Sequence, residues 1–352
     1  MRIAVLATGR NAIRQPYAGG QESQTGTLIR ALRERDHHIR LFAPEGSDPT
    51  QADEFVPYQE LPEMTAVAGA ATAPLELPYL QDHARFYAAV LDLLGSDDLD
   101  VIHNQSLNHL PLVMSSALPV PVVTTLHTPP IPWLELGMSL AGPTSSYVAV
   151  SHSTARLWPA PVAPTVVHNG IDPEEFSGGP GGDHLLWVGR LTPEKGTDLA
   201  IDAAEAAGMD LVLAGPISNT EWFDAVIKPR LQGPIRYAGH LAHSELDKTY
   251  GESAALLFTP QWDEPFGLVA VEAAMTGTPV IALNRGGLAE VVGSGLGVLV
   301  DHLPAAGLTG RLAAVVPEAL AMSRESVRQN AIEHFGAARM AEDYLRVFAA
   351  VA

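Results

Sequence analysis

Short apolar runs alternate with amphipathic stretches along both halves of the chain, a pattern typical of parallel sheets joined by helical crossovers. The strands predicted in the first half are Ile3–Ala7, Ile39–Ala43, Val101–His103, Val120–Leu126, Tyr147–Ser151 and Thr165–His168. Those predicted in the second half are Leu185–Gly189, Leu211–Ala214, Arg236–Ala238, Ala255–Phe258, Pro279–Ala282 and Gly297–Val300. Helical periodicity predicts helices over Gln21–Arg35, Pro78–Leu94, Thr197–Ala207, Ser244–Ser253, Gly267–Thr276 and Ala305–Ala314. The fold class is therefore α/β.

The alternation stops between the two halves. Asp172–Asp183 contains Pro173 and the run Ser177–Gly182, a composition that cannot form a core and suits a hinge. We therefore predict a first Rossmann-like domain over 1–172, a linker over 173–183 and a second Rossmann-like domain over 184–323. The tail, 324–352, is predicted to form one or two helices, with apolar residues at helical spacing: Met340, Tyr344, Val347 and Phe348.

One stretch of the first half has no clear period. Gln59–Pro78 is rich in Ala, Pro, Glu and Thr, and we expect it to be a surface excursion of the first domain. The N-terminus, by contrast, begins directly with a predicted strand, and its apolar run is too short for a signal peptide.

Composition narrows the classes of function. With 352 residues and 47% hydrophobic content, the chain is long enough for two α/β domains. It has 21 Lys and Arg against 40 Asp and Glu, a formal charge of -19, which disfavours nucleic acid and anionic membrane surfaces as partners. It has no cysteine, so disulfides and thiolate nucleophiles are excluded. No apolar stretch reaches the roughly 18 residues of a membrane span, and we expect a cytoplasmic protein.

The strongest chemical signal is the segment Glu264–Glu272, which places two carboxylates eight positions apart across the start of a predicted helix. A helix N-terminus carries unpaired amides and attracts anions. Carboxylates would repel phosphate, so the amides of Phe266, Gly267, Leu268 and Val269 suit a diphosphate, and the two acids suit hydroxyl groups on either side. The same pattern also fits a helix cap at Glu264 and a solvated helix residue at Glu272.

Cations occur in a second segment, directly after a predicted strand. Arg190 and Lys195 lie between Gly189 and Gly196 and ahead of a predicted helix. Arg offers a planar fork of donors and Lys a mobile point charge, a combination suited to a leaving diphosphate, and we expect both side chains to be exposed. Two ordinary surface residues would give the same pattern, although this chain is acidic.

The first half adds glycines and a histidine. Gly19 and Gly20 lie after the first strand, where glycines permit positive φ and close approach of the backbone to an oxyanion. They do not form the fingerprint of dinucleotide-binding enzymes. His127 follows a predicted parallel strand, at the sheet edge where such folds bind ligands, and can hydrogen-bond a sugar hydroxyl or an acceptor. His103 is a weaker candidate of the same kind, and a flexible turn and structural histidines remain alternatives.

One pattern resembles a metal motif. Asp98-Leu99-Asp100 matches the Asp-x-Asp of metal-dependent sugar transferases, but there the pair follows an apolar strand, whereas here it precedes Val101. We therefore predict no metal ligand in this segment and no metal cofactor.

Taken together, these motifs resemble those of retaining glycosyltransferases of family 4, over nearly the whole chain. Further matching pieces, in family order, are Glu22, Asp100–His103, Thr125–His127, Val150-Ser151, Asn169–Asp172, Gly239 and Gly277–Ala282. The resemblance implies the GT-B fold, in which two Rossmann-like domains with parallel sheets face each other across a cleft. It also implies that the first domain binds the acceptor and that the tail helices cross back to it.

The resemblance assigns roles to individual residues. It implies that Arg190 and Lys195 bind the diphosphate, which Gly20 approaches from the first domain, and that Glu272 holds the ribose. Glu264 would hold the transferred sugar with the amides of Phe266, Gly267 and Leu268, and His127 would face that sugar. The base would lie between two strand ends, at Gly215 and at Gly239, His240 and Leu241. Two departures are Arg285, where relatives often carry an uncharged residue, and the loop Asn11–Ala18, which matches no pattern and leaves the acceptor open.

These expectations describe a metal-independent hexosyltransferase that uses a UDP- or GDP-sugar and a small soluble acceptor. Transfer would occur on the front face of the sugar, with the leaving diphosphate taking the acceptor's proton. A sugar phosphorylase or a nucleotide-sugar epimerase would use the same cleft, and a nucleotide-sugar-binding protein would use it without turnover. The spacing of the two acids also permits a two-carboxylate hydrolase, which would not need the cations and paired glycines.

Overall fold

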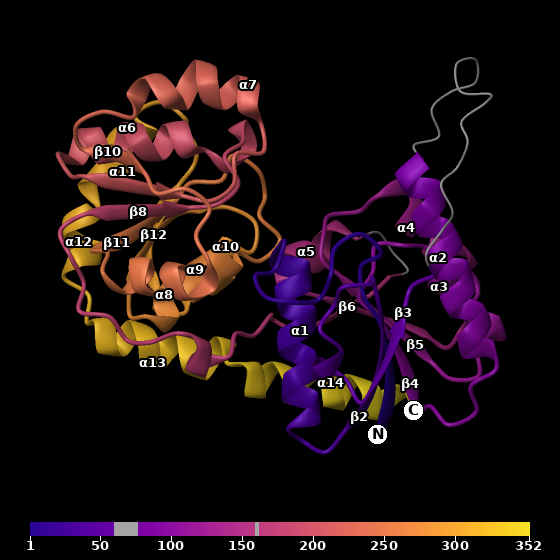
Figure 1. Ribbon diagram of the computed structural model, residues 1–352. Coiled ribbons are helices and arrows are strands. Elements are labelled where there is room, and N and C mark those ends of the chain that lie inside the picture. Colours follow the sequence, from indigo (N-terminus) through magenta and orange to yellow (C-terminus); the bar gives the residue numbers. More distant parts are fainter. Residues whose placement is uncertain (60–76, 159–161) are drawn as a thin grey trace, which may run out of the picture. The chain divides into compact units, whose positions relative to one another are not determined.

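The computed structural model describes residues 1–59, 77–158 and 162–352, and the chain divides into two compact units (Figure 1). The first unit consists of Met1–Val150, Ala155–Val167 and Ala341–Ala352. The second consists of Ser151–Thr154 and His168–Met340. The chain therefore passes between the units more than once, and Ser151–Thr154 is a short excursion of it.

The first unit is a seven-stranded parallel sheet in the order β3-β2-β1-β4-β5-β6-β7. Its strands are β1 Arg2–Leu6, β2 His38–Ala43, β3 Glu54–Pro57, β4 Val101–Asn104, β5 Val122–Leu126, β6 Ser145–Ala149 and β7 Thr165–Val166. Its helices are α1 Gly20–Arg33, α2 Leu77–Leu94, α3 Leu110–Val113, α4 Pro132–Leu140, the C-terminal half of α5 His152–Leu157 and most of α14 Ala337–Val351.

Helices cover both faces of this sheet. Successive side chains of a strand point to opposite faces, so neighbouring residues of β4 contact different helices. In β4, Ile102 belongs to the core cluster that contains Phe86 and Val90 of α2. The next residue, His103, packs its ring against Tyr344 and Phe348 of α14, with ring centroids 4.9 and 5.1 Å away. The tail residues predicted to be apolar and helical, Met340, Tyr344, Val347 and Phe348, are all buried, which confirms that part of the pattern.

The second unit is a six-stranded parallel sheet in the order β10-β9-β8-β11-β12-β13. Its strands are β8 Leu185–Val188, β9 Leu211–Ala214, β10 Ile235–Tyr237, β11 Ala255–Phe258, β12 Val280–Asn284 and β13 Gly297–Asp301. Its helices are α6 Thr197–Ala207, α7 Thr220–Trp222, α8 His243–Gly251, α9 Leu268–Met275, α10 Leu288–Gly293, α11 Leu308–Ala314, α12 Val316–Leu320 and α13 Arg324–Phe335. Helix α6 packs against α11, and α9 packs against α8 and α13.

The glycine-rich run that suggested a hinge is fastened to the second unit. Gly179 N donates to Thr276 O at 3.0 Å, and Gly181 N donates to Gly251 O at 2.9 Å. A Cβ on Gly179 would lie 2.1 Å from the Cα of Gly251, so glycine is needed there for close packing of two backbones. We interpreted this glycine-rich composition as a flexible hinge, but in the structure Gly179 allows two backbones to pack closely.

The tail is also divided differently from the prediction. Helix α13 belongs to the second unit, where the guanidinium of Arg324 donates to the carbonyl oxygens of Gly179, Ser253 and Gly251 at 3.1 Å each. Only Ala341–Ala352 groups with the first unit. Helix α13 is therefore part of the second unit, and the chain returns to the first unit within α14.

The secondary structure differs from the prediction in several places, and part of one predicted segment lies outside the described residues. Strand β3 was missed, because it is four residues long, ends in a proline and lies at the edge of the sheet. The predicted strand Tyr147–Ser151 is Ser145–Ala149, and the turn after it begins α5. Residues 60–76 of the predicted surface excursion lie outside the described residues.

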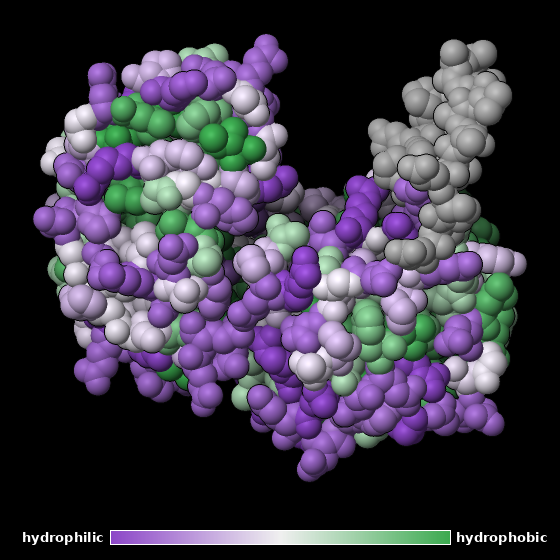
Figure 2. Space-filling model, viewed as in Figure 1, coloured by the Kyte–Doolittle hydropathy of each residue, from purple (hydrophilic) through white to green (hydrophobic). Residues whose placement is uncertain are grey.

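Figure 2 shows that hydrophilic side chains cover most of the visible face of each unit. Within the described part of the chain, no helix combines the length and the apolar character that crossing a membrane would require.

Candidate functional site

In each unit some of the predicted site residues follow the strands between which the strand order reverses. In the first sheet this point is between β1 and β4, and in the second it is between β8 and β11. Crossover helices leave in opposite directions at such a point, which opens a crevice at the carboxyl ends of the strands, where open α/β sheets bind ligands. Arg190 follows β8, and the segment that begins at Glu264 follows β11.

The segment Glu264–Glu272 enters helix α9 through a glycine in the left-handed conformation. Gly267 has φ of 99°, and a Cβ there would lie 2.5 Å from the side chain of Leu288, so both conformation and space require glycine. Among the residues that the structure describes, no acceptor pairs with the amides of Phe266, Gly267, Leu268 and Val269. These amides form the anion-attracting end of α9 that the sequence predicted.

Glu264 lies in the loop before α9, and its partner is Lys195. The Nζ of Lys195 lies 2.9 Å from Oε2 of Glu264, with each side chain 14% exposed. The same ammonium lies 5.0 Å from the ring centroid of Trp262, a cation–π contact. We expected both cations to be exposed; this is wrong for Lys195, because its carboxylate partner and the Trp262 ring cover it.

Arg190 is exposed, as predicted. Within the described part of the chain, its guanidinium has no hydrogen-bond or ion-pair partner. Its five donors are therefore free to bind an anion at the carboxyl end of β8.

Glu272 lies in the second turn of α9 and has a different partner. The hydroxyl of Tyr250 donates to Oε2 of Glu272 at 2.8 Å. Burial raises the pKa of Glu272 above its ordinary value, although the Tyr250 hydrogen bond and the nearby His243 oppose this rise. The two carboxylates of the segment thus lie in separate polar environments, one beside a lysine and the other beside a phenol.

The residues expected to flank a base follow β9 and β10. Gly215 has φ of 133°, and a Cβ there would lie 2.0 Å from Gly189 O. Its amide donates to Gly239 O at 2.8 Å, which joins the two strand ends. His240 is exposed and Leu241 is half-buried, so both side chains reach the surface beside this joint.

In the first unit, the paired glycines do not use positive φ. Gly19 caps α1 in an extended conformation, with φ of -168°, and Gly20 is the first residue of the helix. The conformational part of the glycine argument is therefore wrong, because any residue adopts these angles. What remains is the absence of side chains on Gly19 and Gly20 at the N-terminus of a 14-residue helix, where the nearest atom to a Cβ built on Gly19 would be Oε2 of Glu22, at 3.0 Å.

His127 lies at the carboxyl end of β5 and is held by the loop after β4. Its Nε2 donates to Oε1 of Gln105 at 2.5 Å, and the side-chain amide of Gln21 donates to the backbone oxygen of Gln105. Burial lowers the pKa of His127 to about 4, so its imidazole is neutral at neutral pH. Gln105 thus links His127 to the first turn of α1, next to Gly20.

His103 has a structural role. It is fully buried, its Nε2 lies 2.9 Å from Oγ1 of Thr125, and its pKa is lowered to about 3 by burial and by the proximity of His127. Thr125 in turn lies 2.9 Å from the hydroxyl of Tyr344. This chain of contacts fastens α14 to the sheet.

The Asp-x-Asp segment serves Arg2. The Oδ2 of Asp98 lies 2.6 Å from Nη2 of Arg2, and the Oδ2 of Asp100 accepts from Arg2 N at 2.7 Å. Elsewhere in the described ranges, no three His, Asp or Glu side chains gather in a way that could hold a metal ion.

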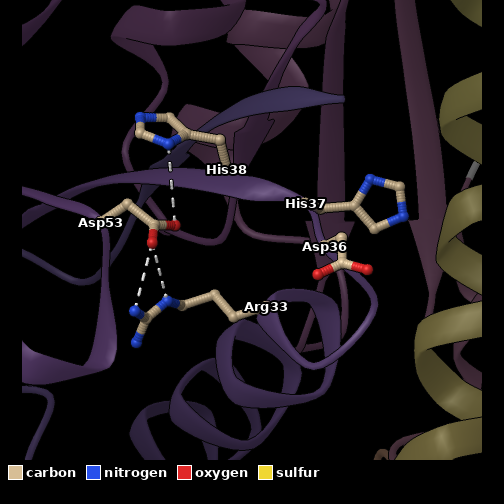
Figure 3. Close-up of a pocket in the computed structure, with 5 residues that line it drawn as sticks. All are labelled: Arg33, Asp36, His37, His38 and Asp53. Carbon is tan, nitrogen blue, oxygen red and sulfur yellow. Dashed lines mark hydrogen bonds and ion pairs between the residues drawn. The ribbon is translucent and has the colours of Figure 1, made fainter.

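A depression of about 270 Å³ lies at the amino-terminal ends of β2 and β3, on the side of the first sheet opposite the carboxyl ends of the strands (Figure 3). Nε and Nη2 of Arg33 donate to Oδ1 of Asp53 at 3.2 and 3.1 Å, and His38 Nδ1 lies 3.9 Å from the other oxygen of Asp53. His37 lies 2.9 Å from the N-terminal amine. The guanidinium of Arg33 in this depression is already paired with Asp53, and the depression lies away from the carboxyl ends of the strands.

The sequence interpretation missed one group of polar residues in the second unit. Glu290 in α10 accepts two backbone hydrogen bonds at 2.7 Å each, from the amides of His152 and Ser153. Ser151 and Thr154 direct their hydroxyls at the carbonyl of Pro265, next to Glu264. The only sequence signal was Val150-Ser151 among the matching motifs, which carried no role.

Comparison with known proteins gives concordant matches. Residues 18–175 match the family Glycosyltransferase Family 4, and residues 178–334 match Glycosyl transferases group 1. A glycogen synthase of Mycobacterium tuberculosis is 30% identical over 355 residues, which cover 88% of this chain and 85% of that protein.

Solved structures resemble the whole chain. The structure of AviGT4, a glycosyltransferase involved in avilamycin A biosynthesis, has a TM-score of 0.71 and 22% identity, and the match covers 99% of this chain and 97% of that one. Anabaena Alr3699/HepE in complex with UDP-glucose has a TM-score of 0.74 and 18% identity, covering 99% and 100%. At such identities the structural matches establish the fold.

Proposed function

Because the chain belongs to glycosyltransferase family 4 and has the GT-B fold, we propose that it moves a hexose from a nucleotide diphosphate sugar to a small soluble acceptor, with retention and without a metal ion. The observation that supports this most is the arrangement after β8 and β11. There the exposed Arg190, the Lys195–Glu264 pair and the free amides of α9 converge on the point where the strand order reverses.

The proposed chemistry uses these groups to stabilise the leaving group. The bond between the anomeric carbon and the diphosphate oxygen breaks, and the bond to the acceptor oxygen forms on the same face. The acceptor's proton goes to the departing diphosphate oxygen. Arg190, Lys195 and the amides from Phe266 to Val269 stabilise the charge that develops on the diphosphate, an effect worth about 3 to 4 kcal/mol per donor in other enzymes. Glu264 hydrogen-bonds the sugar as its ring becomes positive.

The donor is proposed to be a UDP- or GDP-hexose. UDP-glucose is the first to test, because Alr3699/HepE was crystallised with it. Tyr250 holds Glu272 in place for the two hydroxyls of a ribose, and the joint between Gly215 and Gly239 provides the surface for the base. The acceptor is proposed to be small and not strongly anionic, because the chain carries a net charge of -19.

A thermal-shift screen tests the proposal. A donor at 100 times its dissociation constant is expected to stabilise the protein by about 2.7 kcal/mol. We expect a UDP- or GDP-hexose to give the largest shift and to release nucleoside diphosphate slowly with water as acceptor, with the liberated sugar keeping its anomeric configuration in NMR spectra. Phosphate-dependent turnover, or epimerised donor without acceptor, would instead indicate a phosphorylase or an epimerase. Absence of stabilisation by every nucleotide sugar would refute the proposed donor class.

Metal independence is a separate prediction. Activity is expected to be unchanged, within about twofold, in excess EDTA, because Arg190, Lys195 and helix amides would supply the charge that a divalent cation supplies elsewhere. The measurement is nucleoside diphosphate release before and after addition of chelator. Loss of activity that manganese or magnesium restores would contradict it.

A further inference from the structure

The excursion Ser151–Thr154 contacts the segment that the proposed function assigns to the donor sugar. Both hydroxyls reach the same atom, since Oγ of Ser151 donates to Pro265 O at 2.7 Å and Oγ1 of Thr154 donates to it at 3.2 Å. The amide of Thr154 donates to Oγ of Ser151 at 2.9 Å, which fixes that hydroxyl. The Ser151 side chain is 0% exposed and that of Thr154 1%, so water does not compete for these bonds.

The excursion is itself held by Glu290. Its two carboxylate oxygens accept from the amides of His152 and Ser153, and Oε2 also lies 3.0 Å from Nε2 of His168. Burial alone would raise the pKa of Glu290, but the hydrogen bonds from His168 and the two amides lower it overall, so the carboxylate is charged at neutral pH. The Ser151–Thr154 turn therefore has a fixed position on the second unit.

The segment that begins at Glu264 is also held by helix α10, the helix that contains Glu290. Gly287, which caps α10, donates its amide to Glu264 O at 2.7 Å. Two successive carbonyls, those of Glu264 and Pro265, are thus held by Gly287 on one side and by the hydroxyl pair on the other. Between them, these contacts determine where the Glu264 carboxylate and the Phe266 amide lie.

We propose that Ser151 and Thr154 are positioning residues for sugar transfer: they hold the Pro265 carbonyl so that Glu264 and the amide of Phe266 meet the transferred sugar and diphosphate in the reacting geometry. Neither residue touches the donor in this proposal, which rests on the proposed function. The ribose contact at Glu272 lies two turns further along α9 and is independent of the hydroxyl pair. Loss of the pair therefore affects the reaction step and leaves nucleotide binding unchanged.

The test uses Thr154→Val, which removes one hydroxyl at nearly constant volume, and the double variant Ser151→Ala/Thr154→Val. Misplacement of reacting groups by about 1 Å costs about 100-fold in rate. We expect kcat for release of UDP from UDP-glucose to fall about 5- to 10-fold in Thr154→Val and about 100-fold in the double variant. The affinity for UDP, measured by calorimetry, should stay within about twofold. Thr154→Ser keeps the hydroxyl and is expected to restore the rate, and Ser153→Ala, which loses no hydrogen bond to Pro265, is the matched control.

Two further readouts separate positioning from a general loss of structure. In a Glu264→Gln background, Thr154→Val should lower kcat by less than about threefold, because the group that it positions is already impaired. Independently of any donor, exchange of the Gly287 amide with solvent deuterium should speed up in the double variant and not in Ser153→Ala, since this amide reports on the Glu264 carbonyl.

The outcomes are distinguishable from failure of the proposed function. If Glu264→Gln lowers kcat but the double variant retains wild-type kcat and wild-type Gly287 exchange, the positioning role is wrong and the proposed function stands. If UDP affinity falls in step with kcat, the hydroxyls serve the fold or the nucleotide site in general, and the positioning role is again wrong. If the wild-type protein neither binds UDP nor turns over UDP-glucose, UDP-glucose is not the donor, and the exchange of Gly287 still decides whether the hydroxyls hold the segment.

Discussion

Replacing Arg190 by alanine is expected to lower the rate of sugar transfer by about 100- to 1,000-fold, the range found when one transition-state donor is lost. Its guanidinium is exposed and forms no hydrogen bond or ion pair among the described residues, although it interacts electrostatically with Glu194, so its removal breaks no hydrogen bond or ion pair of the folded protein. The thermal midpoint should therefore stay at its wild-type value while kcat falls. Arg190→Lys keeps the charge but loses the planar fork, and an intermediate rate is expected.

Lys195→Ala is expected to lower the rate comparably and also to destabilise the protein. Its ammonium pairs with Glu264, and a partly buried carboxylate left without its partner costs about 1 to 3 kcal/mol. Lys228→Ala is the matched control, because Lys228 forms an exposed pair with Asp224 on the same unit and exposed pairs contribute little. Near-normal kcat in either Arg190→Ala or Lys195→Ala would defeat the diphosphate assignment.

Hydrophobic periodicity predicted most of the sheet elements because parallel strands are buried on both faces and leave continuous apolar runs. Ala255–Phe258 and Leu211–Ala214 agree with the structure residue for residue, as does helix Thr197–Ala207. The missed strand, Glu54–Pro57, lies at a sheet edge and shows no such run. Hydrophobic periodicity therefore predicts a strand well where both faces of the sheet are buried and poorly where the strand lies at the edge of the sheet.

Glycine was the least predictable residue, because its reason lies in contacts between distant segments. Gly267 and Gly215 adopt positive φ and leave space for neighbours, whereas Gly19 is extended and needs no glycine on conformational grounds. Gly179 suggested flexibility, but it permits contact with Gly251, 72 positions away. No window of the sequence contains both partners, so the choice between hinge and close packing required the structure.

The sequence predicted the motifs of the site, but it did not predict which residues of different motifs contact each other. The segment around Glu264 and the loop around Lys195 were each recognised, but their ion pair joins residues 69 positions apart. The same holds for Ser151 and Pro265, which are 114 positions apart. Serine and threonine are common on surfaces, so nothing in their sequence context distinguishes these two buried hydroxyls.

Glu264→Gln and Glu272→Gln are expected to fail in different ways although they change one segment of chain. Glu272 lies beside Tyr250, away from Lys195, and is proposed to hold the ribose. Because ribose is present in both the nucleoside diphosphate and the donor, Glu272→Gln should weaken the binding of both. A charged hydrogen bond is worth about 1.5 to 3 kcal/mol, so the expected loss of affinity is about 10- to 150-fold.

Glu264→Gln should instead depress kcat by a similar factor and barely change affinity for free UDP. Its carboxylate contacts the transferred sugar in our proposal, and its hydrogen bonds strengthen as positive charge develops on the ring, so the interaction is greatest in the transition state. UDP contains no such sugar. Calorimetry with UDP on both variants, together with kcat for UDP-glucose, measures the division. Equal weakening of UDP binding by the two substitutions, or weakening by Glu264→Gln alone, would show that the roles of the two acids are assigned wrongly, because one carboxylate beside Lys195 and one beside Tyr250 would then serve the same part of the ligand.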